Sequence, residues 1–295
     1  MTARSGILLL DKPTGPTSHD LVSRTRRALG TRKVGHAGTL DPMATGLLIL
    51  GVESSTRLLT YLVGLDKEYT ATIRLGQSTD TDDAEGEVVT SAATDQVSDA
   101  DIVAGIRSLT GEIAQVPSSF SAIKVDGVRS YDRARAGESV ELPARSVTVS
   151  DFEVLDTRRI DGLIDLDVRV CVSSGTYVRA LARDLGSSLE VGGHLTALRR
   201  TCVGPFSVDA AVPSEGDLAA ALLTPSSVAR TLFPAVELDA EAALALTHGK
   251  RIPVDVADAP VVAALGPQGR LAGLVIVERG IARVLVNFPS EEVLS

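Results

Sequence analysis

The sequence predicts an α+β protein in which a sheet with flanking helices precedes a small β-rich module. Residues 69–75 and 164–172 alternate apolar and polar side chains, with the period of a half-buried strand. Segments with helical spacing of apolar residues occur between and around these strands. Near the C-terminus, three short apolar strands are expected at residues 260–265, 271–277 and 281–286.

The N-terminal region is expected to alternate buried strands with one helix. Apolar runs at residues 7–10 and 47–52 are typical of short buried strands. Between them, Ser18 is expected to be the N-cap of a helix that ends at Gly30. This helix carries three arginines, Arg24, Arg26 and Arg27.

Two further helices and one long insertion are expected downstream. Ser98 is predicted to cap a helix that ends at Gly111, and another helix follows residue 177 and stops at Gly186. Residues 117–145 show little apolar periodicity but hold several cations. These are Lys124, Arg129, Arg133, Arg135 and Arg145, with Arg107 just before them. A long basic insertion of this kind more often has a function than serves only as a connection.

Charge and composition narrow the classes of function. The net charge of −9 argues against an indiscriminate nucleic-acid binder, which is usually basic. Residues 1–60, however, contain eight Lys and Arg against four Asp and Glu, so an acidic chain can still have a basic face. The apolar run at residues 7–10 is too short for a signal peptide or a membrane span, which predicts a cytoplasmic protein.

The two cysteines predict neither a metal site nor a disulfide framework. Cys171 and Cys202 lie far apart and form no C-x-x-C pair. We expect them to be small buried hydrophobic residues in a reducing compartment.

Residues 35–46 form the most informative segment of the chain. Three glycines in twelve residues, Gly35, Gly38 and Gly46, permit tight turns and close approach of the backbone to a ligand. Pro42 restricts Asp41 to extended geometry, so Asp41 is held on a stiff loop that leads into a strand. Such a loop suits a reactive carboxylate, although an ordinary Asx-turn has the same composition. A phosphate-binding P-loop is excluded because its motif is not met.

The segment G-H-A-G-T-L-D-P-M-A-T-G at residues 35–46 resembles the catalytic motif of the TruB family of pseudouridine synthases almost residue for residue. Further segments resemble family motifs in the same order. They are residues 11–18 (the K-P-x-G-x-T-S motif), 67–69 (the tyrosine motif), 115–124 (the thumb region), 174–186 (the G-T-Y-[IV]-R motif) and 193–200 (the conserved-leucine segment). The resemblance covers roughly residues 5–207 and weakens after Pro213.

The resemblance implies a fold, a reaction and a substrate. The fold would be a mixed, mostly antiparallel central sheet with flanking helices in a catalytic domain over residues 1–230. A thumb-like insertion would span about residues 117–145, and a PUA-like RNA-binding module would span residues 235–295. The reaction would isomerise uridine to pseudouridine at position 55 in the T-loop of tRNA. It needs no metal, cofactor or protein partner, and we expect a monomer.

The resemblance also implies three catalytic residues. Asp41 would be the nucleophile, and the residues are compatible with addition of its carboxylate to C1′ of the sugar or to C6 of the base. Arg179 would pair with Asp41 and keep it ionised, where it would otherwise be an ordinary surface cation on a helix. Tyr69 would stack on the flipped uracil, where it would otherwise be a buried strand aromatic.

Further residues are expected to bind the substrate. Leu198 and Tyr177 come from the family's pocket motifs, and Leu198 would form an apolar wall. His36 would occupy the place left by the extruded base, although a loop histidine bonded to backbone is the plainer reading. Lys12 and a group of nearby cations would neutralise phosphates, unless they are solvated surface cations. The group consists of Arg24, Arg26, Arg27, Arg32 and Lys33.

Three other functions remain to be compared with this one. An RNA-binding chaperone that folds tRNA without chemistry would not need Asp41, Tyr69 and Arg179 together. A guide-dependent synthase of ribosomal RNA usually has longer terminal extensions. A nucleotide-dependent transferase would require the phosphate loop that this chain lacks.

Overall fold

The protein contains one large mixed sheet and one smaller sheet at its C-terminal end. A computed structural model describes residues 4–118, 124–125, 128–129 and 142–288. In spatial order, the large sheet consists of β14 (Val212–Pro213), β1 (Gly6–Lys12), β3 (Thr45–Val52), β12 (Gly193–Val203), β4 (Lys67–Leu75), β11 (Leu163–Val172), β10 (Arg145–Ile160) and β7 (Gly111–Gln115). In addition, β2 (Val34–His36) pairs with β3, and β13 (Phe206–Ser207) pairs with β12.

The expected mixed, mostly antiparallel sheet is confirmed. β1 pairs in parallel with β14, and β3 pairs in parallel with β12, whereas the other neighbours described in this sheet are antiparallel. The parallel junction between β3 and β12 lies in the middle of the sheet. It places the segment that precedes β3 beside β4 and β12, although these elements are far apart in the sequence.

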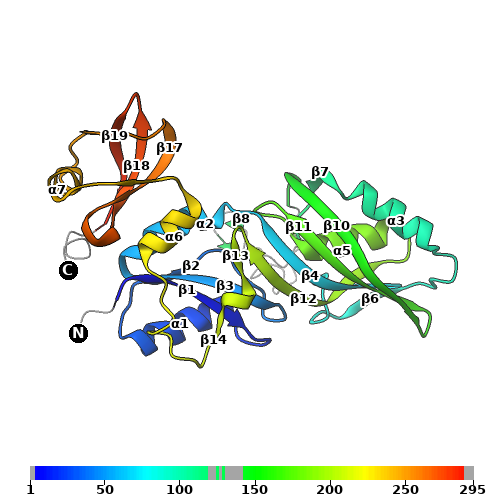
Figure 1. Cartoon of the computed structure of the whole chain (residues 1–295). Coiled ribbons are helices and arrows are strands. Elements are labelled where there is room, and N and C mark those ends of the chain that lie inside the picture. The colour runs from blue at the N-terminus through cyan, green and yellow to red at the C-terminus, as the bar shows by residue number, and fades with distance from the viewer. Residues whose placement is uncertain (1–3, 119–123, 126–127, 130–141, 289–295) are drawn as a thin grey trace.

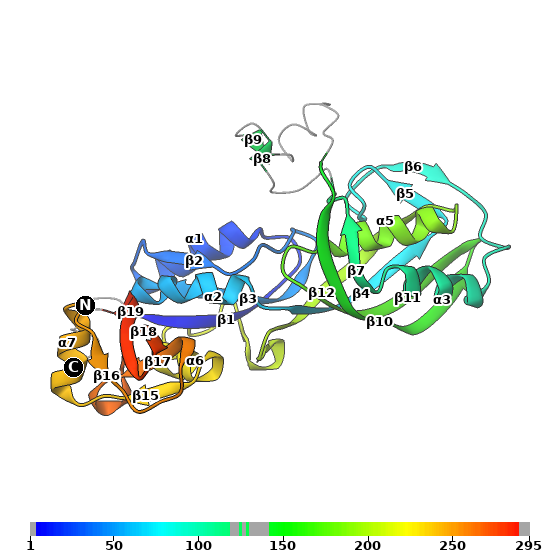
Figure 2. The same ribbon diagram turned by 90° about the horizontal axis from the view of Figure 1, so that it is seen from above.

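Helices pack against both ends of the large sheet (Figures 1 and 2). They are α1 (Ser18–Leu29), α2 (Leu59–Val63), which follows the 3-10 helix η1 (Glu53–Leu58), α3 (Asp99–Ser108) and α5 (Val178–Ser188). α5 packs on β12 and β4, and α3 packs on α5. One hydrophobic cluster fills this interface, with Ile73, Val168, Leu181 and Leu195 among its buried residues.

Three predicted helix boundaries are wrong. The helix expected to end at Gly111, α3, ends at Ser108, and Gly111 is the first residue of β7. The N-cap of α1 is Thr17, which forms a capping box with Asp20, and Ser18 is the first residue of the helix. α5 continues through Gly186 to Ser188. A Cβ atom on Gly186 would lie 2.2 Å from the backbone of Gly192, so this glycine permits close packing and does not end the helix. The Gly30 end of α1 and the Ser98 cap of α3 are confirmed.

The longest strand, β10, was not predicted from the sequence. Its ladder with β11 shifts register twice, between Val149 and Asp151 and again between Val154 and Asp156. Each shift moves the inward-facing positions by one residue, so the alternation of apolar and polar residues is lost. Two smaller pairs of strands complete this region, β5 (Gln77–Thr79) with β6 (Val88–Ser91), and β8 (Lys124–Val125) with β9 (Val128–Arg129). Most of the expected insertion at residues 117–145 lies outside the described residues.

The C-terminal module has a five-stranded sheet, and its three predicted strands are confirmed. The order is β15 (Ala235–Glu237), β17 (Ala259–Leu265), β18 (Leu271–Glu278), β19 (Ile281–Asn287) and β16 (Ile252–Pro253), with α7 (Ala240–Thr247) beside it. α6 (Pro225–Leu232) connects it to the large sheet. The module lies at the β1 and β3 end of the molecule, far from β10 and α3 (Figure 1).

β1 contributes to two cores because its side chains alternate between the faces of the sheet. Leu8 and Leu10 belong to the cluster that includes residues of α1 and β4. Ile7 and Leu9 belong to a second cluster, which includes Leu265, Leu271, Leu274 and Phe288 of the C-terminal module. The module is therefore attached to the sheet by a shared apolar core as well as by its linker.

Candidate active site

The C-terminal end of the segment that carries Asp41 is closely packed against β12. Gly46 has a φ of +98°, and a Cβ atom at this position would lie 2.2 Å from the carbonyl oxygen of Arg200. Gly38 has a similar φ of +95°, but a Cβ atom there would meet nothing nearer than 3.5 Å. Gly46 thus permits both the left-handed turn and the close approach of β3 to β12, whereas Gly38 permits only the turn.

Buried polar side chains hold this segment from two sides. The Ser18 hydroxyl donates to the Leu40 carbonyl at 3.0 Å and accepts from the Leu40 N–H at 2.8 Å. Arg200, which is 1% exposed, donates to the carbonyls of Leu47 at 2.7 Å and Gly38 at 3.2 Å. Because a buried donor without a partner is costly, these bonds restrict the segment to one conformation.

Lys12, for which a phosphate contact is expected from the sequence, binds the segment from a third side. Its side chain is fully buried, and its Nζ donates to the carbonyls of Pro13 at 3.1 Å, Pro42 at 3.1 Å and Ala44 at 2.6 Å. Burial lowers the pKa of Lys12 to about 8, and the nearby Asp41 carboxylate opposes this shift. With three bonds made inside the protein, Lys12 supports the loop under Asp41 and does not face solvent.

Arg179 lies between two carboxylates, Asp41 and Asp83. Its Nη2 is 3.0 Å from Asp41 Oδ2, and its Nη1 is 3.1 Å from Asp83 Oδ2 and 2.8 Å from the Thr81 carbonyl. The other oxygen of Asp83 accepts from the Thr81 hydroxyl at 2.7 Å and from the Glu85 N–H at 3.0 Å. Asp83 therefore holds the guanidinium at Nη1, and the guanidinium contacts Asp41 through Nη2.

The environment of Asp41 favours a reactive carboxylate over a fully solvated one. Burial raises the pKa of Asp41, the Arg179 guanidinium lowers it again, and the negative charge of Asp83 raises it. The Asp41 side chain keeps 38% of its surface exposed, against 4% for Asp83 and 5% for Arg179. Asp41 is thus the member of this group that a substrate can reach.

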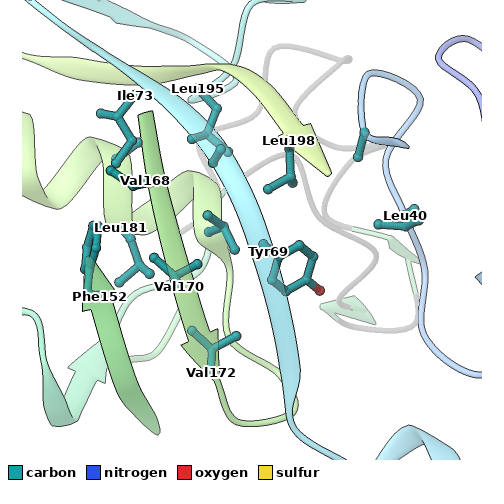
Figure 3. Packing of buried hydrophobic residues seen from close by; sticks show 14 of the residues in the cluster. Leu40, Tyr69, Ile73, Phe152, Val168, Val170, Val172, Leu181, Leu195 and Leu198 are labelled. Carbon is teal, nitrogen blue, oxygen red and sulfur yellow. The ribbon is translucent and has the colours of Figure 1, made fainter. Parts of the chain in front are cut away.

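Asp41 and Arg179 open into a cavity of about 240 Å³ that three other expected residues also line, namely Tyr69, Tyr177 and Leu198. Figure 3 shows Tyr69 and Leu198 on neighbouring strands, β4 and β12, on the side of the sheet that faces Leu40. Tyr69 and Leu198 are each 8% exposed, so each packs into the core while one surface remains open to the cavity. The cavity combines an apolar wall, an aromatic ring and a paired carboxylate.

Lys67 is a cavity residue for which the sequence suggested no role. It lies on β4 two residues before Tyr69, on the same face, and its side chain is buried. Its Nζ donates to the carbonyls of Val63 at 2.6 Å and Leu65 at 2.5 Å. Burial lowers the pKa of Lys67 to about 8, and the charge of Arg200 acts in the same direction. Lys67 thus fixes the end of α2 against the floor of the cavity.

His36 lies outside the group of residues that line the cavity. It is the last residue of β2, where it pairs with Leu50, and it is half-buried. Its Nδ1 is buried and has no hydrogen-bond partner within the described part of the chain. Burial lowers the pKa of His36, which favours the neutral ring at pH 7.

The expected phosphate-binding arginines on α1 divide into two kinds. Arg24 and Arg27 are exposed, and Arg24 forms a surface ion pair with Glu215 at 3.4 Å. Arg26 is half-buried and donates to the Val34 carbonyl at 2.9 Å. Arg24 and Arg27 can therefore meet a ligand from solvent, whereas Arg26 fastens α1 to β2.

Sequence comparison identifies the family to which this site belongs. Residues 26–178 match the N-terminal domain of the TruB family pseudouridylate synthases. Residues 179–244 match a tRNA pseudouridylate synthase B C-terminal domain, and residues 233–289 match a tRNA pseudouridine synthase II C-terminal domain. The chain belongs to the TruB family of pseudouridylate synthases.

Relatives of this TruB family member match it over nearly their whole length. The tRNA pseudouridine synthase B of Leifsonia xyli subsp. xyli is 56% identical over 296 residues, which cover 98% of each chain. That of an Arthrobacter species is 54% identical over 302 residues, again 98% of each chain. Among solved structures, a chain of an H/ACA RNP bound to a substrate RNA containing 2′-deoxyuridine is similar with a TM-score of 0.70 and 26% identity. The match covers 98% of this chain and 86% of that chain.

Two features are absent from the described residues of this TruB family member. None of their helices is both long enough and apolar enough to cross a membrane. They also contain no group of three or more His, Cys, Asp or Glu side chains placed to hold a metal ion.

Proposed function

We propose that this chain isomerises uridine to pseudouridine at position 55 in the T-loop of tRNA. The observation that carries the proposal is the ion pair between Asp41 and Arg179 at a cavity walled by Tyr69 and Leu198. The names of its relatives, which are tRNA pseudouridine synthases B, support tRNA as the substrate. The resemblance of residues 35–46 to the family's catalytic motif supports the T-loop position.

In this proposal, Asp41 is the nucleophile of the reaction. Its carboxylate adds either to C1′ of the ribose or to C6 of the uracil, and the N1–C1′ bond breaks. After the base has turned, a C5–C1′ bond forms and the bond to Asp41 breaks, which releases the carboxylate. C5 loses a proton and N1 gains one, so that the reaction is balanced without a redox partner. Arg179 keeps the buried carboxylate ionised, and Tyr69 stacks on the turning base.

The target nucleotide must leave the stacked T-loop to reach this cavity. Extrusion costs a few kcal/mol, which stacking and pocket contacts recover. The apolar side chain of Leu198 and the ring of Tyr69 provide such contacts for a flat base. His36 lies near the start of the segment that carries Asp41. We propose that its ring takes the place that the base vacates, because burial favours the neutral, planar form of this ring.

Phosphate contacts are proposed at exposed cations on two parts of the molecule. Arg24 and Arg27 lie on the exposed side of α1. In the C-terminal module, the exposed residues Arg251 and Arg283 are the chain neighbours of Ile252 and Ala282, which pair across the sheet. Two like charges side by side favour an anionic ligand such as a phosphate. The protein is proposed to act in the cytoplasm as a monomer, without a protein partner.

An assay on unmodified tRNA transcript tests the proposal. Purified protein, with no cofactor added, is incubated with the transcript, and pseudouridine is mapped by carbodiimide-dependent stops of reverse transcription. We expect one new stop, at position 55. A transcript with cytidine at position 55 and the Asp41→Asn protein are the controls, and both should give no stop.

The same assay separates the alternative functions. A tRNA-folding chaperone would restore the aminoacylation of misfolded tRNA equally well with the Asp41→Asn protein, and wild-type protein would leave no stop. A guide-dependent synthase is suggested by the similarity to a chain from an H/ACA RNP. Such an enzyme would modify the transcript only after a guide RNA and partner proteins were added.

A further inference from the structure

Gln115 makes a two-sided hydrogen-bonded contact with the backbone of Tyr177. It is the last residue of β7, and its side chain is fully buried. Its Nε2 donates to the Tyr177 carbonyl at 3.1 Å, and its Oε1 accepts from the Tyr177 N–H at 2.9 Å. An amide that satisfies both groups of one peptide residue fixes the position and the direction of the backbone at that residue.

The cross-strand partner of Gln115 contacts the same tyrosine. Arg145, the first residue of β10, pairs in register with Gln115. Its guanidinium carbon lies 5.9 Å from the centre of the Tyr177 ring, in the range of a cation–π contact. The two strands that flank residues 116–144 therefore hold Tyr177 together, one through its backbone and the other through its ring.

Tyr177 is the N-cap of α5, and Arg179 follows two residues later in the first turn. The cap makes no side-chain hydrogen bond to the helix, so the contact with Gln115 replaces the usual local restraint. A shift at the start of a helix moves the side chains of its first turn with it. The separation of 3.0 Å between Arg179 and Asp41 thus depends on where Gln115 holds Tyr177.

Residues directly after Gln115 contact the same network. The carbonyl of Val116 accepts from Arg183 Nη2 at 2.7 Å, one turn along α5 from Arg179. The Ser118 hydroxyl donates to the Thr81 carbonyl at 3.4 Å, and this carbonyl also accepts from Arg179. The end of β7 is therefore bonded to the helix that carries Arg179 and to the turn that anchors it.

We propose that Gln115 is a positioning residue for the reaction, which acts through Tyr177 to align Arg179 with Asp41. The proposal rests on the function proposed above for these two residues. Loss of the contact leaves the walls formed by Tyr69 and Leu198 in place but allows the guanidinium to withdraw from the carboxylate. The charged groups around Asp41 are Arg179, Asp83, Lys12 and Glu85, and Arg179 is the one that Gln115 controls.

The test compares Gln115→Met, which has similar length but no hydrogen bonds, with a matched control. Ser146→Ala removes the 2.7 Å bond between Ser146 and Glu112 in the same β7–β10 pair, away from Tyr177. For Gln115→Met we expect a single-turnover rate at least tenfold lower at pH 7, and tRNA affinity within twofold of wild type. We also expect the acid limb of the pH–rate profile to move to higher pH, because Asp41 loses part of its stabilisation by Arg179. Ser146→Ala should match wild type in all three.

A uniform rate loss at every pH, an unchanged rate, or a parallel loss of affinity overturns the proposal. If Gln115→Met does not fold, Gln115→Asn is used, because its shorter amide cannot span both backbone groups and should shift the profile in the same direction. If wild type itself converts no tRNA, the proposed function fails. The Gln115 proposal is then judged by an NMR titration of the Asp41 carboxyl, whose pKa must be higher in the variant than in wild type.

Discussion

Residues 35–46 and residues 79–85 each supply a carboxylate to Arg179, but the two segments differ in what surrounds that carboxylate. Asp83 is 4% exposed at its side chain and uses both oxygens, since it binds Thr81, Glu85 and Arg179. Asp41 is 38% exposed, and within the described residues its carboxylate has Arg179 as its one partner. The two ion pairs of Arg179 therefore differ, because Asp83 is bonded on both oxygens within the fold, whereas Asp41 keeps surface that a substrate can reach.

The two segments also differ in what holds their backbones in place. The segment around Asp41 is bonded to three buried side chains from other elements, Lys12, Ser18 and Arg200. The turn around Asp83 is held mostly by its own residues, including Thr79, which donates to the Asp83 carbonyl at 2.8 Å. The proposed nucleophile thus lies on a segment that distant elements hold in place, and the carboxylate that supports Arg179 lies in a turn held mostly by its own residues.

The largest effect is expected from Asp41→Asn, which keeps the size of the side chain but removes its charge and nucleophilicity. Turnover should fall below detection, while tRNA affinity stays within about tenfold, or ~1.4 kcal/mol. Binding should survive because phosphate contacts and base stacking supply most of it. Single-turnover conversion and filter binding on the same preparation check both values. A comparable rate would place the nucleophile elsewhere, and a joint loss of binding and turnover would make Asp41 structural.

Asp83→Asn should lower the rate less than Asp41→Asn does. It should also shift the pH dependence of the rate in the direction opposite to that expected for Gln115→Met. Activity requires ionised Asp41, so the rate falls as the pH falls through the raised pKa of Asp41. Removing the negative charge of Asp83 lowers that pKa, which moves the acid limb to lower pH. The plateau should drop by about 10²-fold, because Arg179 loses an anchor, an effect of about 2.7 kcal/mol. An acid limb that moves upward would show that Asp83 acts on Asp41 only through Arg179.

Gly46→Ala and Gly38→Ala form a matched pair within the Asp41 segment. Both force a Cβ atom onto a residue with φ near +95°, which costs about 1–3 kcal/mol. Only Gly46→Ala also drives that atom against the Arg200 carbonyl, which should add about 1–3 kcal/mol. Urea unfolding of the two proteins measures the difference. Equal losses of stability would mean that β3 and β12 can separate without cost.

The smallest effect is expected for Arg24→Ala combined with Arg27→Ala, which should leave both carboxylate segments intact. Each lost phosphate contact should reduce the slope of log affinity against log salt by about 0.7–0.9. Arg159→Ala is the matched control, because Arg159 is also half-exposed in a surface ion pair but lies at the far end of β10. Binding titrations at several salt concentrations compare the slopes. An unchanged slope in the double variant would mean that this side of α1 does not meet the RNA.

The sequence alone determined the elements whose signals are local. Alternation predicted β4 and β11, and Gly30 and Ser98 predicted one end each of α1 and α3. The resemblance of residues 35–46 to a family motif pointed to Asp41 for the same reason, since a motif is read from neighbouring residues. Side-chain period and capping depend on contacts within a few residues, so they are visible before the chain is folded.

The tertiary structure decided the roles that depend on partners distant in the sequence. Lys12 belonged to a recognised motif, yet only folding showed that its ammonium group donates to the carbonyls of Pro42 and Ala44. Asp83 has no local pattern that marks it, and the thumb segment that begins at Gln115 assigned no role to this residue. Each acts on a residue at least sixty positions away in the chain, Arg179 and Tyr177. Charge and hydrogen bonding act through space, so the sheet order that brings these residues together had to be known first.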